Sequence, residues 1–384
     1  MSFEFATATE IVFGRGRVAE LGRRARALGR RALLVTGARP DRWPRALDSL
    51  REAGVDSVVF SVPGEPSTGL AERGVELARK EQVELVIGLG GGSALDAAKA
   101  IAGLTPNPGE PLDYLEVVGL GRALERPSLP SILVPTTAGT GSEVTKNAVL
   151  TAETQRVKVS LRGLGLLPRL ALVDSELTHS VPPDVTAATG LDALTQVLEP
   201  YVSKARGPLT DALCLEGLTR GARSLRRAVE DGSDAAARED LAVTSLFGGL
   251  ALANAKLGAV HGFAGPLGGR YDAPHGALCA RLLPEVMREN LAAVRELGAQ
   301  NDVADRYATI ARIFTSRGDA RPEDGIEWVE ALVRDLKIPG LSSYGASWDD
   351  FDTLVDKAAA ASSMKGNPVE LSRAALVKIL ERSF

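Results

Sequence analysis

The sequence predicts an α/β domain with a parallel sheet, followed by an all-α domain. Short aliphatic runs alternate with amphipathic helical patterns in the first half, which is typical of a parallel sheet covered by helices. Two loops rich in glycine and hydroxyl side chains directly follow two of these runs. From about residue 183 the short runs stop and long helical periodicity takes over. We therefore expect domains at residues 1–182 and 183–384.

Length and composition narrow the class of protein. A chain of 384 residues is too long for one ordinary core, and 45% hydrophobic with 24% charged residues is a usual globular balance. The net charge of −4, without a long basic run, argues against nucleic-acid binding. Two cysteines cannot frame a disulfide-rich fold. No signal peptide or apolar run of ~20 residues is visible, so we expect a soluble cytoplasmic protein, with a homodimer as the default assembly.

The elements of the first half can be placed in order. Residues 83–89 are apolar on both faces apart from Glu84, as expected for a strand that is covered on both sides. Similar runs predict further strands, and apolar periodicity of about 3.6 predicts helices between them. The predicted strands are 32–36, 57–62, 83–89 and 131–134, and the predicted helices are 44–53 and 68–81.

A glycine loop follows the third strand. Gly90, Gly91, Gly92 and Ser93 lead directly into a helical pattern. Such a loop lets a ligand approach the backbone, and the helix N-terminus favours an anion. The pattern is neither GxGxxG nor a P-loop, because Lys99 lies well inside the helix. A tight strand-to-helix turn is the alternative, but the flanking strand and helix favour phosphate binding.

A second loop, residues 135–143, follows the fourth strand and carries three threonines, a serine and two glycines. Its hydroxyl groups could hold a ribose or a pyrophosphate through neutral donors. Alternatively, they cap the next helix. Two loops of this kind favour a dinucleotide over a single phosphate.

The second half reads as a series of helices. The third of them is rich in glycine and alanine, which suits close helix packing. We expect His261 near its end, a turn at GPLGG, and His275 at the start of the next helix. Pro368 should open the last helix, after a loop at 365–368. The predicted helices are 184–203, 208–231, 235–263, 301–314, 323–335, 348–361 and 369–383.

Four side chains of this half are candidate metal ligands. Asp192 and Gln196 are four positions apart and share one face of a helix. His261 and His275 are two of only three histidines. A carboxylate, an amide oxygen and two imidazoles could hold a divalent metal with an open position. From spacing alone, a solvated Asp192 and two hydrogen-bonded histidines are the favoured alternative.

Across nearly its whole length the chain resembles the iron-containing (group III) alcohol dehydrogenases. The motifs that carry the resemblance are FGRG at 13–16, GGGSALDAAKA at 90–100, PTTAGTGSE at 135–143, LPRLALVDSELTHSVP at 167–182, TGLDALTQ at 189–196 and HGFAGPLGGRYDAPHG at 261–276. Dehydroquinate synthase shares the fold, but its motifs fit less well.

The resemblance implies an active site in a cleft between the two domains. It implies hydride transfer between NAD(P) and an alcohol or aldehyde, assisted by Fe²⁺ or Zn²⁺. By position, the metal ligands fall on Asp192, Gln196, His261 and His275. The cofactor contacts fall on Gly91, Gly92, Ser93, Asp96, Thr136, Thr137, Thr140, Ser142, Lys158 and Leu177.

Two departures from the family pattern concern the metal and the proton. The family usually has histidine at the position of Gln196, whose neutral carbonyl oxygen is a weak ligand. It often has another histidine at the position of Gly265, so a proton-relay candidate is missing. His275 and His261 remain the catalytic candidates, with His275 the acid/base group if no metal binds. Retention of Asp192 favours a metal site, because maleylacetate reductases, expected to work without metal, commonly lose this aspartate.

The cofactor preference depends on the residues after the first dinucleotide-fold strand. NAD-preferring relatives often have an aspartate where this chain has Gly37. Arg39 could pair with the 2′-phosphate of NADP, although most arginines simply point into solvent. We expect NADP or dual use.

Three functional hypotheses follow. The first is an NAD(P)-dependent alcohol dehydrogenase or aldehyde reductase with metal-assisted polarisation of the substrate oxygen. The second is a metal-independent reductase of the maleylacetate-reductase type. The third is a catalytically inactive nucleotide-binding relative.

Overall fold

A computed structural model describes residues 3–271, 273–297 and 302–384. The chain forms two compact units. One comprises Ala6–Thr137 and Gly141–Ser180; the other comprises Val181–Phe384, Ala138–Thr140 and the N-terminal residues up to Phe5. The sequence placed the boundary after residue 182. The predicted fold class, a parallel sheet with helices followed by a largely helical domain, is confirmed.

The first unit is built on a parallel sheet. Among the described residues, six strands pair in the order β1-β8-β5-β4-β2-β3, all in parallel. The four predicted strands are present with small shifts at their ends. Two four-residue strands, β1 and β8, were not predicted, because such short runs carry little periodicity. The strands are β1 Glu10–Phe13, β2 Arg31–Thr36, β3 Asp56–Ser61, β4 Leu85–Gly90, β5 Ser131–Pro135 and β8 Leu170–Val173.

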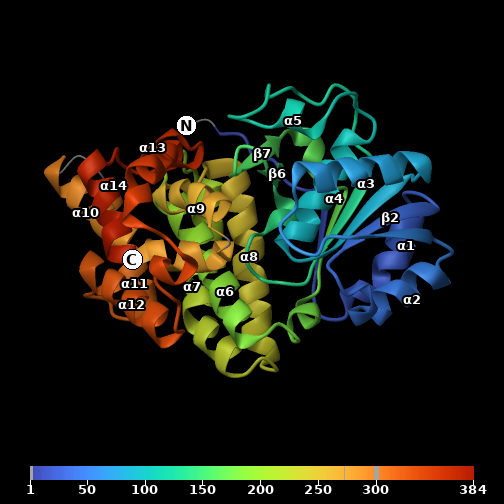
Figure 1. Cartoon of the computed structure of the whole chain (residues 1–384). Helices are drawn as coiled ribbons and strands as arrows, with labels where there is room; N and C mark the ends of the chain where they lie inside the picture. Colours follow the sequence, from blue (N-terminus) through green and yellow to red (C-terminus); the bar gives the residue numbers. More distant parts are fainter. Residues whose placement is uncertain (1–2, 272, 298–301) are drawn as a thin grey trace. The chain divides into compact units, whose positions relative to one another are not determined.

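Helices cover both faces of this sheet. Figure 1 shows α3 (Thr68–Lys80) and α4 (Gly92–Leu104) on one face and α1 (Leu21–Arg26) and α2 (Pro44–Glu52) on the other. Alternate residues of β2 enter different cores: Leu33 and Val35 pack with α3 and α4, whereas Ala32 and Leu34 pack with α1 and α2. This double burial explains why the strands read as continuous apolar runs.

An antiparallel hairpin and a short helix complete the first unit. The hairpin consists of β6 (Asn147–Ala152) and β7 (Val157–Arg162), and the short helix is α5 (Pro111–Tyr114). Alternate residues of β6 are buried. The sequence did not predict this hairpin, because threonine and lysine interrupt its apolar pattern.

The second unit is helical. Helix α10 packs against α6, α9, α12 and α14, while α6, α7 and α8 pack on one another. Glycine permits the closest approaches; a Cβ added at Gly190 would lie 2.3 Å from Leu225 Cδ1. The helices are α6 Pro183–Val202, α7 Pro208–Glu230, α8 Ala235–Ala255, α9 Ala259–Arg270, α10 His275–Glu296, α11 Val303–Thr315, α12 Pro322–Asp335, α13 Phe351–Ala360 and α14 Arg373–Ser383.

The prediction of a single helix over 235–263 is wrong, because the structure has two helices there, α8 and α9. Lys256 adopts φ 60° and ψ 165°, a conformation outside the helical regions, and this ends α8. His261 consequently lies in the first turn of α9, and the GPLGG sequence continues that helix rather than forming a turn. Among the described residues, no single helix is long and apolar enough to span a membrane; α8 and α9 reach that length and composition only together, across a bend of 100°.

The start of the last helix also differs from the prediction. Pro368 does not open it; α14 begins at Arg373, where the Ser372 hydroxyl accepts a hydrogen bond from the Ala375 amide at 3.2 Å. A hydroxyl cap is a stronger start signal than a proline five residues earlier. The predicted start of another helix at residue 301 lies outside the described residues.

A buried lysine fixes the loop after β5. Lys99 lies on α4, and its ammonium group donates hydrogen bonds to the Ser142 carbonyl (3.0 Å) and the Thr145 hydroxyl (2.9 Å). It also lies 3.0 Å from the Asp96 carboxylate. Burial lowers the pKa of Lys99, against the attraction of Asp96. Lys99 is therefore a structural anchor for this loop.

Glu143, beside this anchor, has an unusual titration. Its side chain is buried, and burial raises its pKa to about 7, although the charge of Lys99 opposes the shift. The folded chain therefore keeps this proton at pH values where the unfolded chain releases it. The contribution of Glu143 to stability must fall as pH rises from about 4.5 to about 7.

We predict that Glu143→Gln stabilises the protein at pH 8 more than at pH 5. The gain should reach at most about 3 kcal/mol, because one pKa unit corresponds to about 1.4 kcal/mol. Urea unfolding of both proteins at the two pH values measures it. Glu153→Gln, at an exposed site of the same unit, controls for loss of a carboxylate. An equal difference at both pH values would contradict the raised pKa.

Candidate metal centre and nucleotide-binding loops

One face of α6 carries three polar side chains in a buried helix. Gln196 and Glu199 follow Asp192 by four and seven positions, so the three side chains lie on the same side of the helix. Their exposed fractions are 2%, 3% and 3%. Buried polar groups require partners, and each of these three side chains meets a different one.

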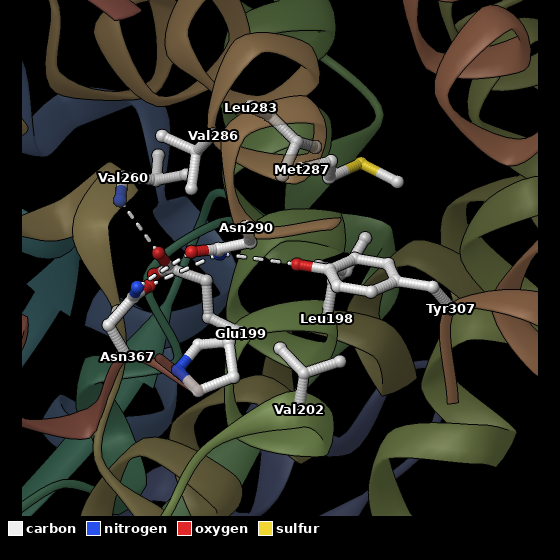
Figure 2. Close-up of a pocket in the computed structure, with 12 residues that line it drawn as sticks. Leu198, Glu199, Val202, Val260, Leu283, Val286, Met287, Asn290, Tyr307 and Asn367 are labelled. Atoms are coloured by element: carbon white, nitrogen blue, oxygen red, sulfur yellow. Dashed lines mark hydrogen bonds between the residues drawn. The ribbon is translucent and has the colours of Figure 1, made fainter. Parts of the chain in front are cut away.

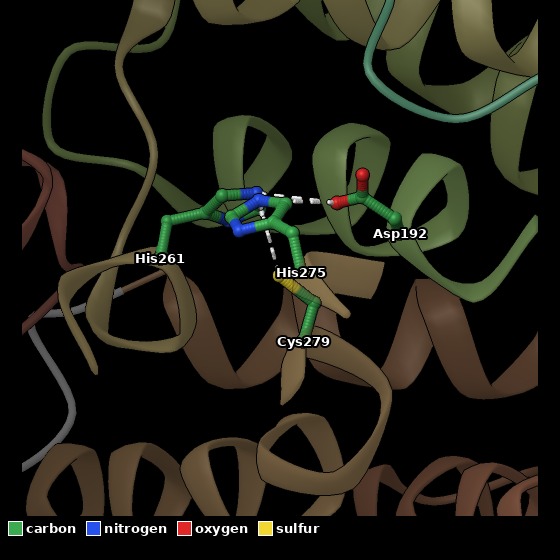
Figure 3. A group of neighbouring side chains, drawn as sticks. All are labelled: Asp192, His261, His275 and Cys279. Atoms are coloured by element: carbon green, nitrogen blue, oxygen red, sulfur yellow. Dashed lines mark hydrogen bonds and ion pairs between the residues drawn. The ribbon is translucent and has the colours of Figure 1, made fainter. Parts of the chain in front are cut away.

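Asp192 meets a cluster formed by α9 and α10. His261 comes from the first turn of α9, His275 is the first residue of α10, and Cys279 follows one turn later on the same helix. Figure 3 shows the four side chains converging, and one ligand atom from each lies within 4.8 Å of all the others. The structure therefore brings together three of the four predicted ligands and adds a cysteine that the sequence reading missed.

The distances within the cluster are uniform. Asp192 Oδ1 lies 3.4 Å from His261 Nε2 and 3.9 Å from His275 Nε2. Cys279 Sγ lies 3.7 Å and 3.6 Å from the same two nitrogens. The His275 side chain is 33% exposed, whereas those of His261 and Asp192 are 7% and 2% exposed. The cluster therefore opens to solvent on the His275 side.

These residues fit a divalent cation. Donors in a tetrahedral shell at usual zinc bond lengths of about 2.0–2.3 Å lie roughly 3.3–3.7 Å apart, close to the distances found. Asp192 Oδ1 accepts no hydrogen bond from the described residues, although it is buried. A cation would satisfy that oxygen, because isolated buried carboxylates are costly.

A second buried carboxylate fixes the orientation of His261. Glu199 Oε2 lies 2.6 Å from His261 Nδ1, and Glu199 Oε1 accepts the Val260 amide at 2.8 Å. The Nδ1 proton is thereby held by Glu199, which leaves Nε2 to face Asp192. The sequence analysis missed Glu199, because a spacing of seven from Asp192 places it on the same helix face but does not show that it meets His261.

Polar side chains behind Glu199 hold the start of α9. Asn367 Oδ1 accepts a hydrogen bond from the Ala259 amide at 3.1 Å, and Asn367 Nδ2 donates one to Asn290 Oδ1 at 2.7 Å. Asn290 Nδ2 donates in turn to the Tyr307 hydroxyl at 3.2 Å. Figure 2 shows this network in a pocket with otherwise largely aliphatic walls. The predicted loop at 365–368 thus supports the backbone that carries His261.

The charges in the cluster stabilise one another. Burial opposes protonation of both histidines, but their interactions with Cys279 and Asp192 outweigh it. The pKa of His261 is raised well above its usual value, and that of His275 to about 9. Burial disfavours the Asp192 anion, yet the close approach of His261 Nε2 and the charges of both histidines lower its pKa. Positive charge is therefore favoured at the centre of the cluster.

Gln196 makes a different contact. Its Nε2 donates to the carbonyl of Gly139 at 2.8 Å, so it holds the segment Ala138–Thr140, which belongs to the helical unit. Thr140, a predicted cofactor contact, lies in the same segment. Metal ligation by Gln196 remains a prediction.

Several of the predicted nucleotide contacts lie at one edge of the sheet. Gly37, Gly91 and Thr137 follow the adjacent strands β2, β4 and β5. A Cβ at Gly91 would lie 3.4 Å from Thr137 Oγ1, and one at Gly90 would lie 3.6 Å from the Gly37 nitrogen. The connections from β2 and from β4 run in opposite directions across the sheet, which is where such folds bind dinucleotides.

Helix α4 presents an open N-terminus at this edge. Gly91 occupies the N-cap position without a capping side chain, and Gly92 and Ser93 form the first turn. Their amide groups are available to an anion, and the helix dipole favours one. Thr136 lies beside them, since its amide donates to the Gly90 carbonyl at 2.9 Å.

The other predicted cofactor residues have these positions. Asp96 accepts a hydrogen bond from the Ser142 hydroxyl at 2.6 Å. Lys158, on β7, pairs with Glu65 at 3.2 Å. Leu177 lies in the short helix Ser175–Thr178 after β8. Arg39 is 70% exposed and pairs with Asp41 at 3.3 Å. Their role in cofactor binding remains a prediction.

Comparison with known proteins covers both units. The family "Iron-containing alcohol dehydrogenase" matches residues 8–175, and "Fe-containing alcohol dehydrogenase family, C-terminal" matches residues 186–384. The chain is 35% identical over 395 residues to 1,3-propanediol dehydrogenase of Citrobacter freundii, covering 100% of this chain and 99% of that protein.

Solved structures agree with this assignment. A crystal structure of 1,3-propanediol oxidoreductase superposes with a TM-score of 0.93 at 33% identity and covers 100% of both chains. Sulfoacetaldehyde reductase from Bifidobacterium kashiwanohense, in complex with NAD⁺, gives a TM-score of 0.87 at 30% identity, over 100% of this chain and 99% of that one.

We predict that Glu199→Gln weakens metal binding, because an amide holds the His261 proton less well than a carboxylate. The Zn²⁺ dissociation constant should rise about 10- to 100-fold, as measured by competition with a chromophoric chelator. Glu289→Gln is the matched control: Glu289 is also a buried carboxylate, paired with Arg382 at 3.0 Å, about 15 Å along α10 from Cys279. Equal affinity loss in both variants would refute the role given to Glu199.

Proposed function

Because the chain belongs to the iron-containing alcohol dehydrogenase family, it is an oxidoreductase that acts on CH–OH groups, and we propose that it is an NAD(P)-dependent alcohol dehydrogenase or aldehyde reductase. The observation that carries the proposal is the convergence of Asp192, His261, His275 and Cys279 within 4.8 Å. An inactive relative would have no reason to keep an unsatisfied buried carboxylate among two imidazoles.

Each residue has a defined part in this proposal. Asp192, His261 and His275 would hold a divalent metal, and Glu199 keeps His261 in the binding orientation. When bound, the metal supplies a Lewis acid for the substrate oxygen, and the nicotinamide supplies or accepts the hydride. His275 is the most exposed of the ligands, so the substrate alcohol or aldehyde would approach on its side.

The nucleotide would bind at the carboxyl edge of the sheet. The amides of Gly91, Gly92 and Ser93 would receive the pyrophosphate at the start of α4. Thr136 and Thr137 would supply neutral hydroxyl donors. Asp96 and Ser142 bond to each other, so they would shape the loop around the cofactor as well as contact it.

One observation favours a second candidate, a metal-independent reductase. This chain has Gln196 where the family usually has a histidine ligand, and the Gln196 amide already donates a hydrogen bond to the Gly139 carbonyl. In that case His275 would exchange the substrate proton with solvent, to which its side chain is open. The presence of Asp192, with its unsatisfied oxygen, favours the metal-dependent reaction.

We predict that a chelator abolishes oxidation of primary alcohols and reduction of aldehydes, and that added Zn²⁺ or Fe²⁺ restores both. Initial rates with NAD⁺ and with NADH before chelation, after it and after metal addition give the result. The metal-free protein should still bind NADH, as measured by the change in NADH fluorescence on binding, because the glycine loop does not need the metal. Unchanged turnover after complete metal removal would favour the second candidate, and binding without turnover over a broad panel would favour an inactive relative.

We propose that the chain uses NAD and also accepts NADP. The NAD⁺ complex of a relative supports the first cofactor. No carboxylate directly follows β2, and Arg39 could contact a 2′-phosphate, but its pairing with Asp41 weakens that contact. The two opposite charges make neither cofactor strongly preferred.

We predict that Asp41→Asn raises the ratio of kcat/KM for NADP⁺ to that for NAD⁺, and that Arg39→Ala lowers it. Each change should be about two- to fivefold, since exposed ion pairs contribute about 1 kcal/mol or less. Arg51→Ala is the control, because Arg51 lies at the C-terminal end of α2 and pairs with Asp48. If the ratio is unaffected in both variants, Arg39 does not read the 2′-phosphate.

A further inference from the structure

We propose that Cys279 is a thiolate ligand of the metal, so that this chain has an Asp-His-His-Cys centre that selects Zn²⁺ over Fe²⁺. The inference deepens the proposed function and rests on it for the role of the metal. It concerns a residue outside the ligand set that the family resemblance implies.

The geometry places the sulfur where a fourth donor is needed. Cys279 follows His275 by one helical turn, so both side chains leave the same face of α10. Cys279 Sγ lies 3.6 Å from His275 Nε2 and 3.7 Å from His261 Nε2. In a tetrahedral zinc site, with Zn–S of about 2.3 Å and Zn–N of about 2.0–2.1 Å, a sulfur and a nitrogen lie roughly 3.5–3.6 Å apart.

An independent observation marks the same point as a cation site. Asp192 is 2% exposed, its Oδ1 accepts no hydrogen bond from the described residues, and that oxygen is the atom 3.4 Å from His261 Nε2. Figure 3 shows the carboxylate and the thiol of Cys279 meeting at the two imidazoles. The unsatisfied oxygen and the sulfur thus belong to one coordination shell.

The Gln196 side chain is engaged in a hydrogen bond outside the cluster. Its amide nitrogen holds the Gly139 carbonyl at 2.8 Å. An amide oxygen would be a neutral and weak ligand, whereas a thiolate is charged and soft. With Cys279, the shell contains two anionic and two neutral donors, which balances the charge of a divalent ion.

The thiolate determines which metal is preferred. Thiolate and imidazole together suit zinc, whereas exclusively hard oxygen donors favour other cations. Zinc also expands from four donors to five, so the sulfur does not close the centre to a substrate oxygen.

Cobalt substitution tests the ligand directly. The protein is stripped of metal and loaded with Co²⁺, whose bond to a thiolate gives an intense charge-transfer absorption in the near ultraviolet. The chain has two cysteines, both free. We expect the absorption in the wild type and in Cys214→Ala, where Cys279 is the remaining thiol, and its loss in Cys279→Ser. Absence of the absorption in Co²⁺-loaded wild type, or failure of Co²⁺ to bind, overturns the proposal without requiring any variant to fold.

Metal affinity tests selectivity. Chelator competition under anaerobic conditions should show tighter binding of Zn²⁺ than of Fe²⁺ to the wild type. In Cys279→Ser the Zn²⁺ dissociation constant should rise by more than about 100-fold, beyond the loss from residues that only orient a ligand. Gln196→Leu should change it less than about tenfold, below the roughly 10- to 100-fold loss caused by removing a residue that orients a ligand. A larger loss in Gln196→Leu than in Cys279→Ser overturns the assignment.

Failure of this inference is distinguishable from failure of the proposed function. The cobalt spectrum is recorded without substrate or nucleotide. A thiolate absorption without turnover of any alcohol or aldehyde would contradict the proposed activity and leave the ligand in place. Metal-dependent turnover without the absorption would contradict the ligand alone.

Discussion

The burial of the Asp192 carboxylate is the constraint on which the helical unit depends. An ion of this size loses several kcal/mol of hydration when it is buried, and α6 is buried along most of its length. Two imidazoles and a thiol are the groups that meet it, and they come from two other helices. The packing of α9 and α10 against α6 therefore has an electrostatic as well as an apolar component.

The position of His261 depends on a chain of supports. Lys256 ends α8 with a positive φ of 60° and an extended ψ of 165°, which lets α9 begin in a new direction. Asn367 holds the Ala259 amide, and Glu199 holds both the Val260 amide and His261 Nδ1. The break is thus part of the site.

The sheet unit meets a different requirement, which is to expose backbone amides at its carboxyl edge. Gly91 approaches Thr137 closely, so the two loops form one surface. Lys99, on α4, holds the second loop in place through buried hydrogen bonds to the Ser142 carbonyl and the Thr145 hydroxyl. The loop that would contact a nucleotide is therefore held by the buried ammonium group of Lys99.

The sequence by itself determined the strand and helix periods, the two glycine-rich loops and three of the four clustered side chains, since these depend on local pattern and on motifs. The tertiary structure alone decided the break between α8 and α9, the hairpin β6–β7, and the places of Glu199 and Cys279. A helix break is set by one backbone dihedral angle at Lys256, which periodicity does not encode. Glu199 and Cys279 have ordinary helical positions in the sequence, and their chemistry arises only where three helices converge.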